Sequence, residues 1–155
     1  MAGAEPLAVY CHETNPAGTW YAHGAPANAI FEFSGEIVFT YRGSWVAEGG
    51  TTSWESAWRI VGTTGTLLWD GADNFDARAV AEQSGFLRPL RDVVVSPPPH
   101  PSETHGHASV IAEFLDAVET GRTPETAGAD NIKSLAMVFA AIESARTRQR
   151  VLIAA

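Results

Sequence analysis

Two hydrophobic periodicities follow one another along this chain of 155 residues, and their order constrains the fold most. Up to about residue 95, apolar and polar residues alternate in short runs between turn residues, as in strands with one buried face. From residue 109 onward, apolar residues recur every three or four positions, as on one helix face. Strands followed by helices predict the α+β class, with an open, mainly antiparallel sheet and helices packed on one face. We expect a single domain over residues 1–155.

The alternating part of the chain contains several expected strands. They cover residues 7–12, 27–33, 36–46, 53–61 and 66–70, with weaker candidates at 77–82 and 86–95. Ser34-Gly35 is a two-residue turn signal between alternating runs, so we expect a hairpin there. Pro89 makes the last candidate an edge strand or a broken one, because proline cannot donate to a strand ladder.

Two helices are expected in the last third of the chain, over residues 109–120 and 129–146. Gly121 and Pro124 end the first helix. Its apolar stripe consists of Val110, Ile111, Phe114, Leu115 and Val118. The stripe of the second helix consists of Ile132, Leu135, Phe139 and Ile142. Residues 151–153 are a candidate last strand.

Charge and composition exclude several classes of protein. Ten basic and eighteen acidic residues give a net charge of −8, which argues against nucleic acid or an anionic membrane as partner. No apolar run approaches the length of a membrane span, and residues 1–6 do not resemble a signal peptide. The single cysteine, Cys11, allows no internal disulfide and fits a reduced cytoplasmic protein, most simply as a small buried hydrophobic residue.

Three segments of the sequence carry a family resemblance. The first is GTTGTL at Gly62–Leu67, after a tryptophan-rich strand, and the second is EFLDAVETGRTP at Glu113–Pro124. The third runs from Asp130-Asn131 through AAIESA at Ala140–Ala145 to Arg150-Val151. In this order and spacing they resemble the C-terminal domain of the glucose–fructose oxidoreductase, inositol dehydrogenase and MocA family. The resemblance extends from about Pro6 to Ile153.

The resemblance implies a part of an NAD(P)-dependent oxidoreductase acting on sugars, inositols and related polyols. Such proteins have an N-terminal dinucleotide-binding domain and a C-terminal α+β domain. The open sheet of the second domain shapes the substrate pocket and commonly makes the oligomer contact.

The chain lacks three motifs that this resemblance would supply in a complete enzyme. It has no Gly-x-Gly-x-x-Gly after a strand and no Glu-Lys-Pro, and the family's Asp-x-x-x-His would lie just upstream of the first strand. The only lysine, Lys133, falls in the last helix, in a run that matches a packing helix. We therefore expect neither catalytic nor cofactor-binding residues in this chain, with NAD or NADP serving the complete enzyme.

The loop after the first strand holds the candidate substrate residues Trp20, Tyr21 and His23. Aromatic faces would contact sugar C–H groups and the imidazole would contact a hydroxyl. The alternative is a loop with two aromatic side chains tucked under it, and both interpretations stay open.

Five tryptophans are many for a chain of this length, and Trp45, Trp54 and Trp58 fall on neighbouring expected strands. An aromatic sheet face can be core, dimer contact or sugar platform, and burial favours the first two. Arg42 and Arg59 project from the strand faces opposite the main apolar stripe. They would either bridge a symmetric sheet-to-sheet contact or stay solvated. The candidate oligomer residues are thus Arg42, Trp45, Trp58 and Arg59.

The histidines His100, His105 and His107 invite a metal interpretation. No spaced cysteine or carboxylate completes a site around them, so we expect no metal.

The leading hypothesis is a substrate-side and oligomerisation domain that is inactive without a separate dinucleotide-binding half. We expect a homodimer through the open sheet and a small sugar or polyol as ligand. The alternative is a non-catalytic sugar-binding or assembly module derived from the same family.

Overall fold

The computed structural model of the chain describes residues 3–95, 106–124 and 126–154, and these residues form two helices and two antiparallel sheets of four strands each. The predicted α+β class and the open, antiparallel character of the sheets are confirmed. The chain divides into two compact units. The first contains residues 1–47 and 110–155, and the second contains residues 48–109.

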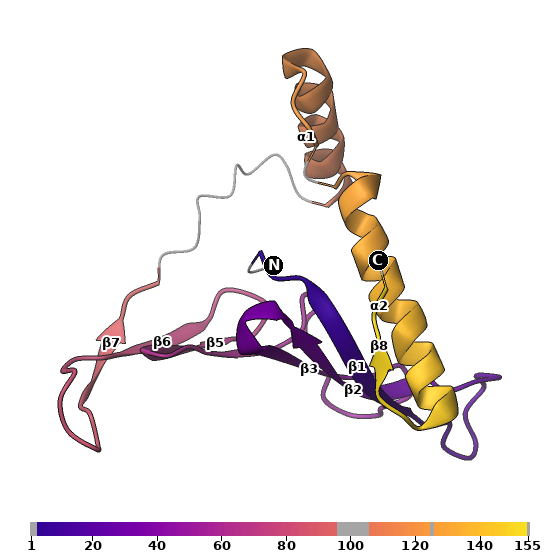
Figure 1. Cartoon of the computed structure of the whole chain (residues 1–155), viewed down its shortest axis with the longest axis horizontal. Helices are drawn as coiled ribbons and strands as arrows, with labels where there is room; N and C mark the ends of the chain where they lie inside the picture. The colour runs from indigo at the N-terminus through magenta and orange to yellow at the C-terminus, as the bar shows by residue number, and fades with distance from the viewer. Residues whose placement is uncertain (1–2, 96–105, 125, 155) are drawn as a thin grey trace. The chain divides into compact units, whose positions relative to one another are not determined.

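The sheet of the first unit has the strand order β3-β2-β1-β8 (Figure 1). Its strands are β1 (Pro6–Glu13), β2 (Pro26–Phe33), β3 (Ile37–Ser44) and β8 (Val151–Leu152). The predicted hairpin joins β2 to β3 through a short 3-10 turn, Ser34–Glu36, in which Gly35 adopts a positive φ of 71°. The expected last strand is confirmed as β8, which pairs with β1.

The sheet of the second unit has the order β4-β5-β6-β7. Its strands are β4 (Trp58–Val61), β5 (Gly65–Trp69), β6 (Phe75–Val80) and β7 (Leu90–Val93). The expected strand over residues 53–61 starts only at Trp58. Residues 53–57 turn instead, because Ser53 Oγ donates to Gly71 O at 3.0 Å and Ser56 has a φ of 66°. The strands therefore lie in two sheets, where the sequence predicted one.

The helices are α1 (His107–Thr120) and α2 (Gly128–Thr147), close to their predicted bounds. Helix α2 packs mainly on β1 and β8 (Figure 1). Val9 and Cys11 of β1 lie opposite Phe31 and Ala29 of β2, and with Ala140 of α2 these residues form the buried core. The expectation that Cys11 is a buried hydrophobic residue is confirmed, and burial raises the pKa of its thiol.

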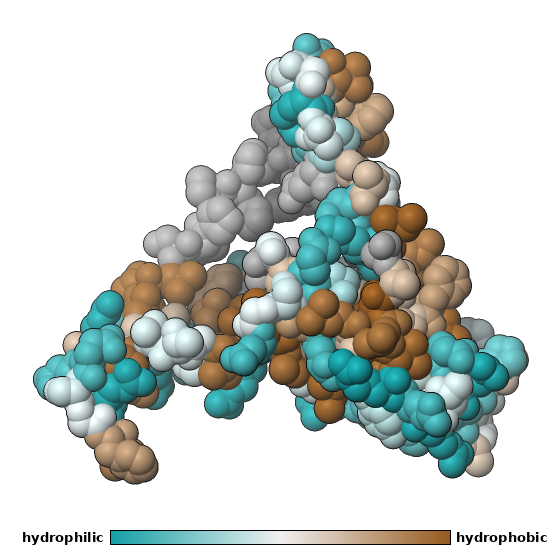
Figure 2. All heavy atoms as spheres, in the orientation of Figure 1, coloured by the Kyte–Doolittle hydropathy of each residue, from teal (hydrophilic) through white to brown (hydrophobic). Residues whose placement is uncertain are grey.

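The side of α2 that faces the sheet is not the predicted stripe. Met137, Ala140 and Ala141 lie against the core, whereas the predicted stripe residues are more than half exposed. The small side chains of Ala140 and Ala141 occupy this side of α2, because they let the helix backbone approach the sheet closely. The stripe of α1 is exposed in the same way, and Figure 2 shows hydrophobic residues along one side of each helix.

Ser144 fixes α2 to β1 in the first unit. Its side chain is fully buried, and its hydroxyl accepts the Cys11 N–H at 2.8 Å and donates to Gln149 O at 2.5 Å. Arg148, with a φ of 57°, ends α2 by donating its N–H to Ser144 O at 2.7 Å. Ser144 thereby connects α2 to β1 and to the segment that leads into β8.

An ion pair adds a second tie between the chain's C-terminal end and the sheet. Arg150 donates to both carboxylate oxygens of Glu32, at 2.7 and 2.6 Å. The hydrogen bond from this guanidinium is the main cause that holds the pKa of the Glu32 carboxyl below its ordinary value.

Replacing Ser144 by alanine should lower the free energy of unfolding by about 1–3 kcal/mol, because the buried Cys11 N–H loses its acceptor. Urea denaturation measures the loss. Ser134→Ala, at an exposed position of the same helix, should cost less than about 0.5 kcal/mol. Equal losses in the two variants would contradict the role given to Ser144.

Replacing Glu32 by glutamine should flatten the acid side of the stability profile. The folded-state pKa of Glu32 is lowered, so its stabilisation is present above the unfolded-state pKa of about 4.3 and is lost as the pH falls through the folded value. The urea midpoint of the wild type should therefore fall more steeply between neutral and acidic pH than that of Glu32→Gln. Glu36→Gln is the matched control and should keep the wild-type slope.

Candidate functional site

A long apolar hollow lies on the sheet of the first unit, beside α2. Two adjoining cavities, of about 350 and 450 Å³, share the lining residues Phe39, Ser134 and Met137. We call them together the α2 trough. Strands β2 and β3 supply its floor: Ala27, Ala29, Phe31, Phe33, Ile37, Phe39 and Tyr41. One side of α2 supplies its wall.

Backbone alternation explains why so many aromatic side chains face the trough. Phe31 lies opposite Phe39 and Phe33 opposite Ile37 in the β2–β3 register, so all four project from the same face of the sheet. The rings of Phe31 and Phe39 stack with centroids 6.0 Å apart. Ile37, Phe39 and Tyr41 share one face of β3, and that face is the one that α2 partly covers.

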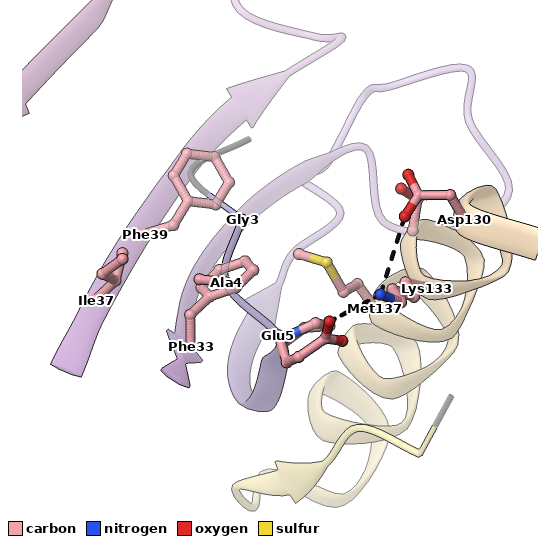
Figure 3. Close-up of a pocket in the computed structure, with 11 residues that line it drawn as sticks. Gly3, Ala4, Glu5, Phe33, Ile37, Phe39, Asp130, Lys133 and Met137 are labelled. Atoms are coloured by element: carbon pink, nitrogen blue, oxygen red, sulfur yellow. Dashed lines mark hydrogen bonds and ion pairs between the residues drawn. The ribbon is translucent and has the colours of Figure 1, made fainter. Parts of the chain in front are cut away.

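The charged end of the trough is built around Lys133, the only lysine (Figure 3). Its Nζ donates to Glu5 Oε1 at 2.8 Å and lies 3.9 Å from Asp130 Oδ1. The hydrogen bond to Glu5 is the main cause that raises the pKa of Lys133. Lys133 therefore joins α2 to the segment that leads into β1, in accord with the packing helix predicted for it.

The loop between β1 and β2 holds the three predicted substrate residues. The Asn15 amide donates to Tyr21 O at 3.1 Å, and the Trp20 and Tyr21 rings lie 4.6 Å apart. Trp20 is 86% exposed, whereas Tyr21 is half-buried. The structure thus brings Trp20 and Tyr21 together at the loop surface.

His23 faces a further hollow of about 520 Å³, which shares Glu13 and Ile142 with the α2 trough. Glu13, Asn15 and Arg146 line the same hollow, at the end of β1 and near the end of α2. The sequence interpretation missed Glu13, Asn15 and Arg146 as site residues. Glu13 and Asn15 stand next to the predicted loop and could have been found, but no sequence pattern links Arg146 to it.

The four predicted oligomer residues divide between the two units. Arg42 of β3 projects from the face opposite α2, and Trp45 follows the end of β3 and is 68% exposed. Trp58 and Arg59 start β4 in the second unit, on opposite faces of that sheet. Trp54 precedes β4 and lies in no strand, so the predicted alignment of three tryptophans on strands is wrong.

An aromatic row replaces the predicted one within the second unit. Trp58, Trp69 and Phe75 lie opposite one another across β4, β5 and β6. The Trp69 and Phe75 rings stack at 5.9 Å, and the Trp58 and Trp69 indoles donate to Glu55 O and Ala72 O. The indole nitrogens are thus satisfied by backbone, which fits a structural role for this row.

The described residues do not form the strand-to-helix arrangement of a Rossmann dinucleotide site. Such a cofactor places its pyrophosphate at a helix N-terminus that directly follows a strand of a parallel sheet. Here every strand pair is antiparallel. Helix α2 carries Asp130 in its first turn and no side-chain cap, so a phosphate would meet a carboxylate there.

A metal site is also not formed by the residues that the structure describes, since no three His, Cys, Asp or Glu side chains gather in a group that could hold an ion. His100 and His105 lie outside the described residues. Over the same described ranges, neither helix combines the length and apolarity that crossing a bilayer requires.

Comparison with known proteins gives one family and one fold. Residues 12–153 match the model of an oxidoreductase family, described as its C-terminal alpha/beta domain. No curated protein matches the chain. Among solved structures, an Agrobacterium radiobacter oxidoreductase in complex with NAD+, L-tartaric acid and magnesium is 18% identical with a TM-score of 0.71, covering 96% of this chain and 44% of that one.

Two further solved structures are similar to the same extent. Levoglucosan dehydrogenase in complex with NADH and L-sorbose is 18% identical with a TM-score of 0.70, covering 97% of this chain and 45% of its own. Aldose–aldose oxidoreductase from Caulobacter crescentus, complexed with glycerol, is 19% identical with a TM-score of 0.69, covering 97% and 42%. The chain thus spans less than half the length of the solved proteins whose fold it shares.

Proposed function

Since the chain belongs to the glucose–fructose oxidoreductase, inositol dehydrogenase and MocA oxidoreductase family, as its C-terminal domain, we propose that it is the substrate-side and oligomerisation part of an NAD(P)-dependent sugar or polyol oxidoreductase. In this proposal the chemistry depends on a dinucleotide-binding half that these residues do not supply. The chain alone then binds no dinucleotide and turns over no substrate. The family and the single buried thiol also fit a cytoplasmic enzyme.

The observation that carries the proposal is the combination of a match over nearly the whole chain with coverage of less than half of the solved proteins. Hydride transfer needs a held nicotinamide, an acid or base at the hydroxyl, and a surface that orients the substrate carbon. The antiparallel sheets and the acidic start of α2 do not suit the first role. The third role remains for this domain.

The substrate wall that we assign is the β1–β2 loop. The Trp20 and Tyr21 rings present apolar faces suited to sugar C–H groups, and the His23 imidazole is exposed and suited to a hydroxyl. The hollow that His23 shares with Glu13 and Arg146 adds a carboxylate and a guanidinium, both of which bind hydroxyl groups. Sugars and polyols are the ligands that match such a surface.

We assign the oligomer contact to open sheet surface, with Arg42 and Trp45 in the first unit and Trp58 and Arg59 in the second. On the sheet face opposite α2, Tyr10, Ile30 and Val38 are 44%, 48% and 61% exposed, which leaves an apolar surface next to Arg42. Exposed apolar patches on a sheet commonly mark protein contacts, and a homodimer would cover this one.

Titration of the purified chain with NADH and NADPH, followed by cofactor fluorescence, tests the proposed division of labour. No binding should appear in the micromolar range, whereas addition of a dinucleotide-binding half should restore it together with sugar oxidation. Micromolar binding by the chain alone would contradict the proposal. Calorimetric binding of inositol or hexoses without any dinucleotide-binding partner would favour the non-catalytic module instead.

Sedimentation tests the oligomer contact. The chain should sediment as a dimer at micromolar concentration, and Trp45→Asp or Trp58→Asp should shift it to the monomer, because a buried unpaired carboxylate opposes association. Trp54→Asp, outside the assigned contact, is the control and should leave the dimer intact. A dimer that survives both Trp45→Asp and Trp58→Asp would contradict the assignment.

A further inference from the structure

The hollow beside His23 lies between the β1–β2 loop and the last turns of α2. Its ionisable lining side chains are Glu13, His23 and Arg146, and its volume of about 520 Å³ is in the range of small-molecule sites. Within the described residues, the Glu13 carboxylate takes part in no hydrogen bond or ion pair. Glu13 is therefore the acidic group that this hollow presents to a ligand.

Arg146 does not compensate the charge of Glu13, because its guanidinium is already paired. Its Nε donates to Glu143 Oε2 at 3.0 Å, and its Nη2 donates to Glu143 Oε1 at 2.7 Å. The charges of Arg146 and Glu143 thus cancel, and the charge of Glu13 remains. This balance of charges favours a positively charged group in the hollow.

The end of α2 adds negative potential at the same place. Ala145 and Arg146 line the hollow, and α2 ends at Thr147, so the hollow adjoins the last turn of a helix of 20 residues. The backbone dipoles of a helix give its C-terminal end a partial negative charge, which attracts cations. The carboxylate and the helix end therefore favour the same sign of charge in a ligand.

Gly24 leaves room for the Glu13 side chain to lie against the loop. A Cβ at position 24 would overlap Cγ and Oε1 of Glu13, and Gly24 does not adopt the left-handed backbone that would itself favour glycine. The base of the loop is also fixed, because the Thr14 N–H donates to Pro26 O at 3.1 Å and the Ala25 N–H donates to Thr14 O at 3.2 Å. These contacts place the Glu13 carboxylate beside the loop.

Groups suited to hydroxyls and to C–H bonds lie next to the carboxylate. Asn15 and His23 line the hollow. The Asn15 side chain also accepts the Thr19 hydroxyl at 2.6 Å and donates to Tyr21 O. Through these bonds the loop brings the paired rings of Trp20 and Tyr21 next to the residues of the hollow. A fitting ligand therefore carries hydroxyl groups and an apolar ring face as well as a positive charge.

We propose that the ligand of this hollow is a hydroxylated primary amine, such as an amino sugar or an aminocyclitol, whose ammonium group pairs with Glu13. This inference rests on the proposed function, since it specifies the ligand of the substrate wall assigned there. The ammonium would lie between the Glu13 carboxylate and the end of α2, and the ring of the ligand would contact Trp20 or Tyr21. A neutral sugar can also donate to the carboxylate, but it lacks the Coulomb attraction that an ammonium adds.

Calorimetry of the full chain measures this preference with two matched pairs of ligands, glucosamine against glucose and an amino-inositol against inositol. At least one amine should bind about fivefold more tightly than its neutral counterpart at neutral pH, the ratio expected of a partly exposed ion pair. The pair with the larger ratio identifies the ring. N-acetylglucosamine, which keeps the ring without the charge, should bind no more tightly than glucose. Equal affinities within both pairs, or no millimolar binding of either amine, would overturn the proposal.

Substitution of Glu13 assigns the preference to a side chain. Glu13→Gln should reduce the ratio to less than about twofold and keep the binding of the neutral sugar, because the amide still accepts hydroxyl hydrogen bonds. Glu119→Gln, the matched control, removes the same charge from an exposed position of α1 and should keep the wild-type ratio. An unchanged ratio in Glu13→Gln would overturn the proposal.

Two further variants change the hollow without removing Glu13. Gly24→Ala displaces the carboxylate and should lower the ratio. Arg146→Gln releases Glu143 from its ion pair and should raise the ratio, because a second negative charge then remains. A fall in Arg146→Gln, or an unchanged ratio in Gly24→Ala, would also overturn the proposal.

The readout is a ratio of affinities and depends on neither NADH binding nor turnover. Micromolar NADH binding by the chain alone would contradict the proposed function and leave this ratio unchanged. Equal affinities for amine and neutral sugar would contradict this inference and leave the proposed function unaffected. The two proposals can therefore fail separately.

Discussion

The close contact between α2 and β1 is the interaction on which the first unit depends. It is made by small side chains, Ala140 and Ala141 against Val9 and Cys11, and is fixed by the buried Ser144 hydroxyl. Because α2 lies close to β1, the chain that leaves the helix at Arg148 returns directly into β8, where Arg150 reaches Glu32. The same placement to one side of the sheet leaves the strip over β2 and β3 that becomes the α2 trough.

Much apolar surface stays exposed on the described residues of this arrangement. The larger apolar side chains of both helices stay exposed, among them Phe114 of α1 and Phe139 of α2, and the trough adds a recessed apolar surface. An autonomous protein of this size would bury most such surface. We propose that the rest of a complete family enzyme covers part of this surface, since the chain spans less than half the length of the solved proteins whose fold it shares.

Local patterns in the sequence predicted much of this fold, and the failures have identifiable causes. The Ser34-Gly35 turn and the alternation around Phe31 and Phe39 specify the β2–β3 hairpin without tertiary information. Hydrophobic periodicity predicted both helices but assigned the wrong side of α2 to the core. Small residues such as Ala140 are only weakly hydrophobic, although they allow the closest approach of the helix to the sheet. The predicted strand does not form before Trp58, because a backbone group distant in sequence, the Gly71 carbonyl, holds Ser53 in a turn. The loop candidates Trp20 and Tyr21 do meet in space, whereas the proximity of Arg146 to His23 depends on α2 crossing β1, which no local pattern encodes.

Native-state hydrogen exchange of the isolated chain tests the central role of the α2–β1 contact most directly. Exchange reports the free energy of local opening residue by residue. If the contact stabilises the domain, the slowest amides will be those of β1, above all the Cys11 N–H held by Ser144, together with the part of α2 around Ala140. The contrary result would be slowest exchange in β4–β7, with β1 and α2 opening first.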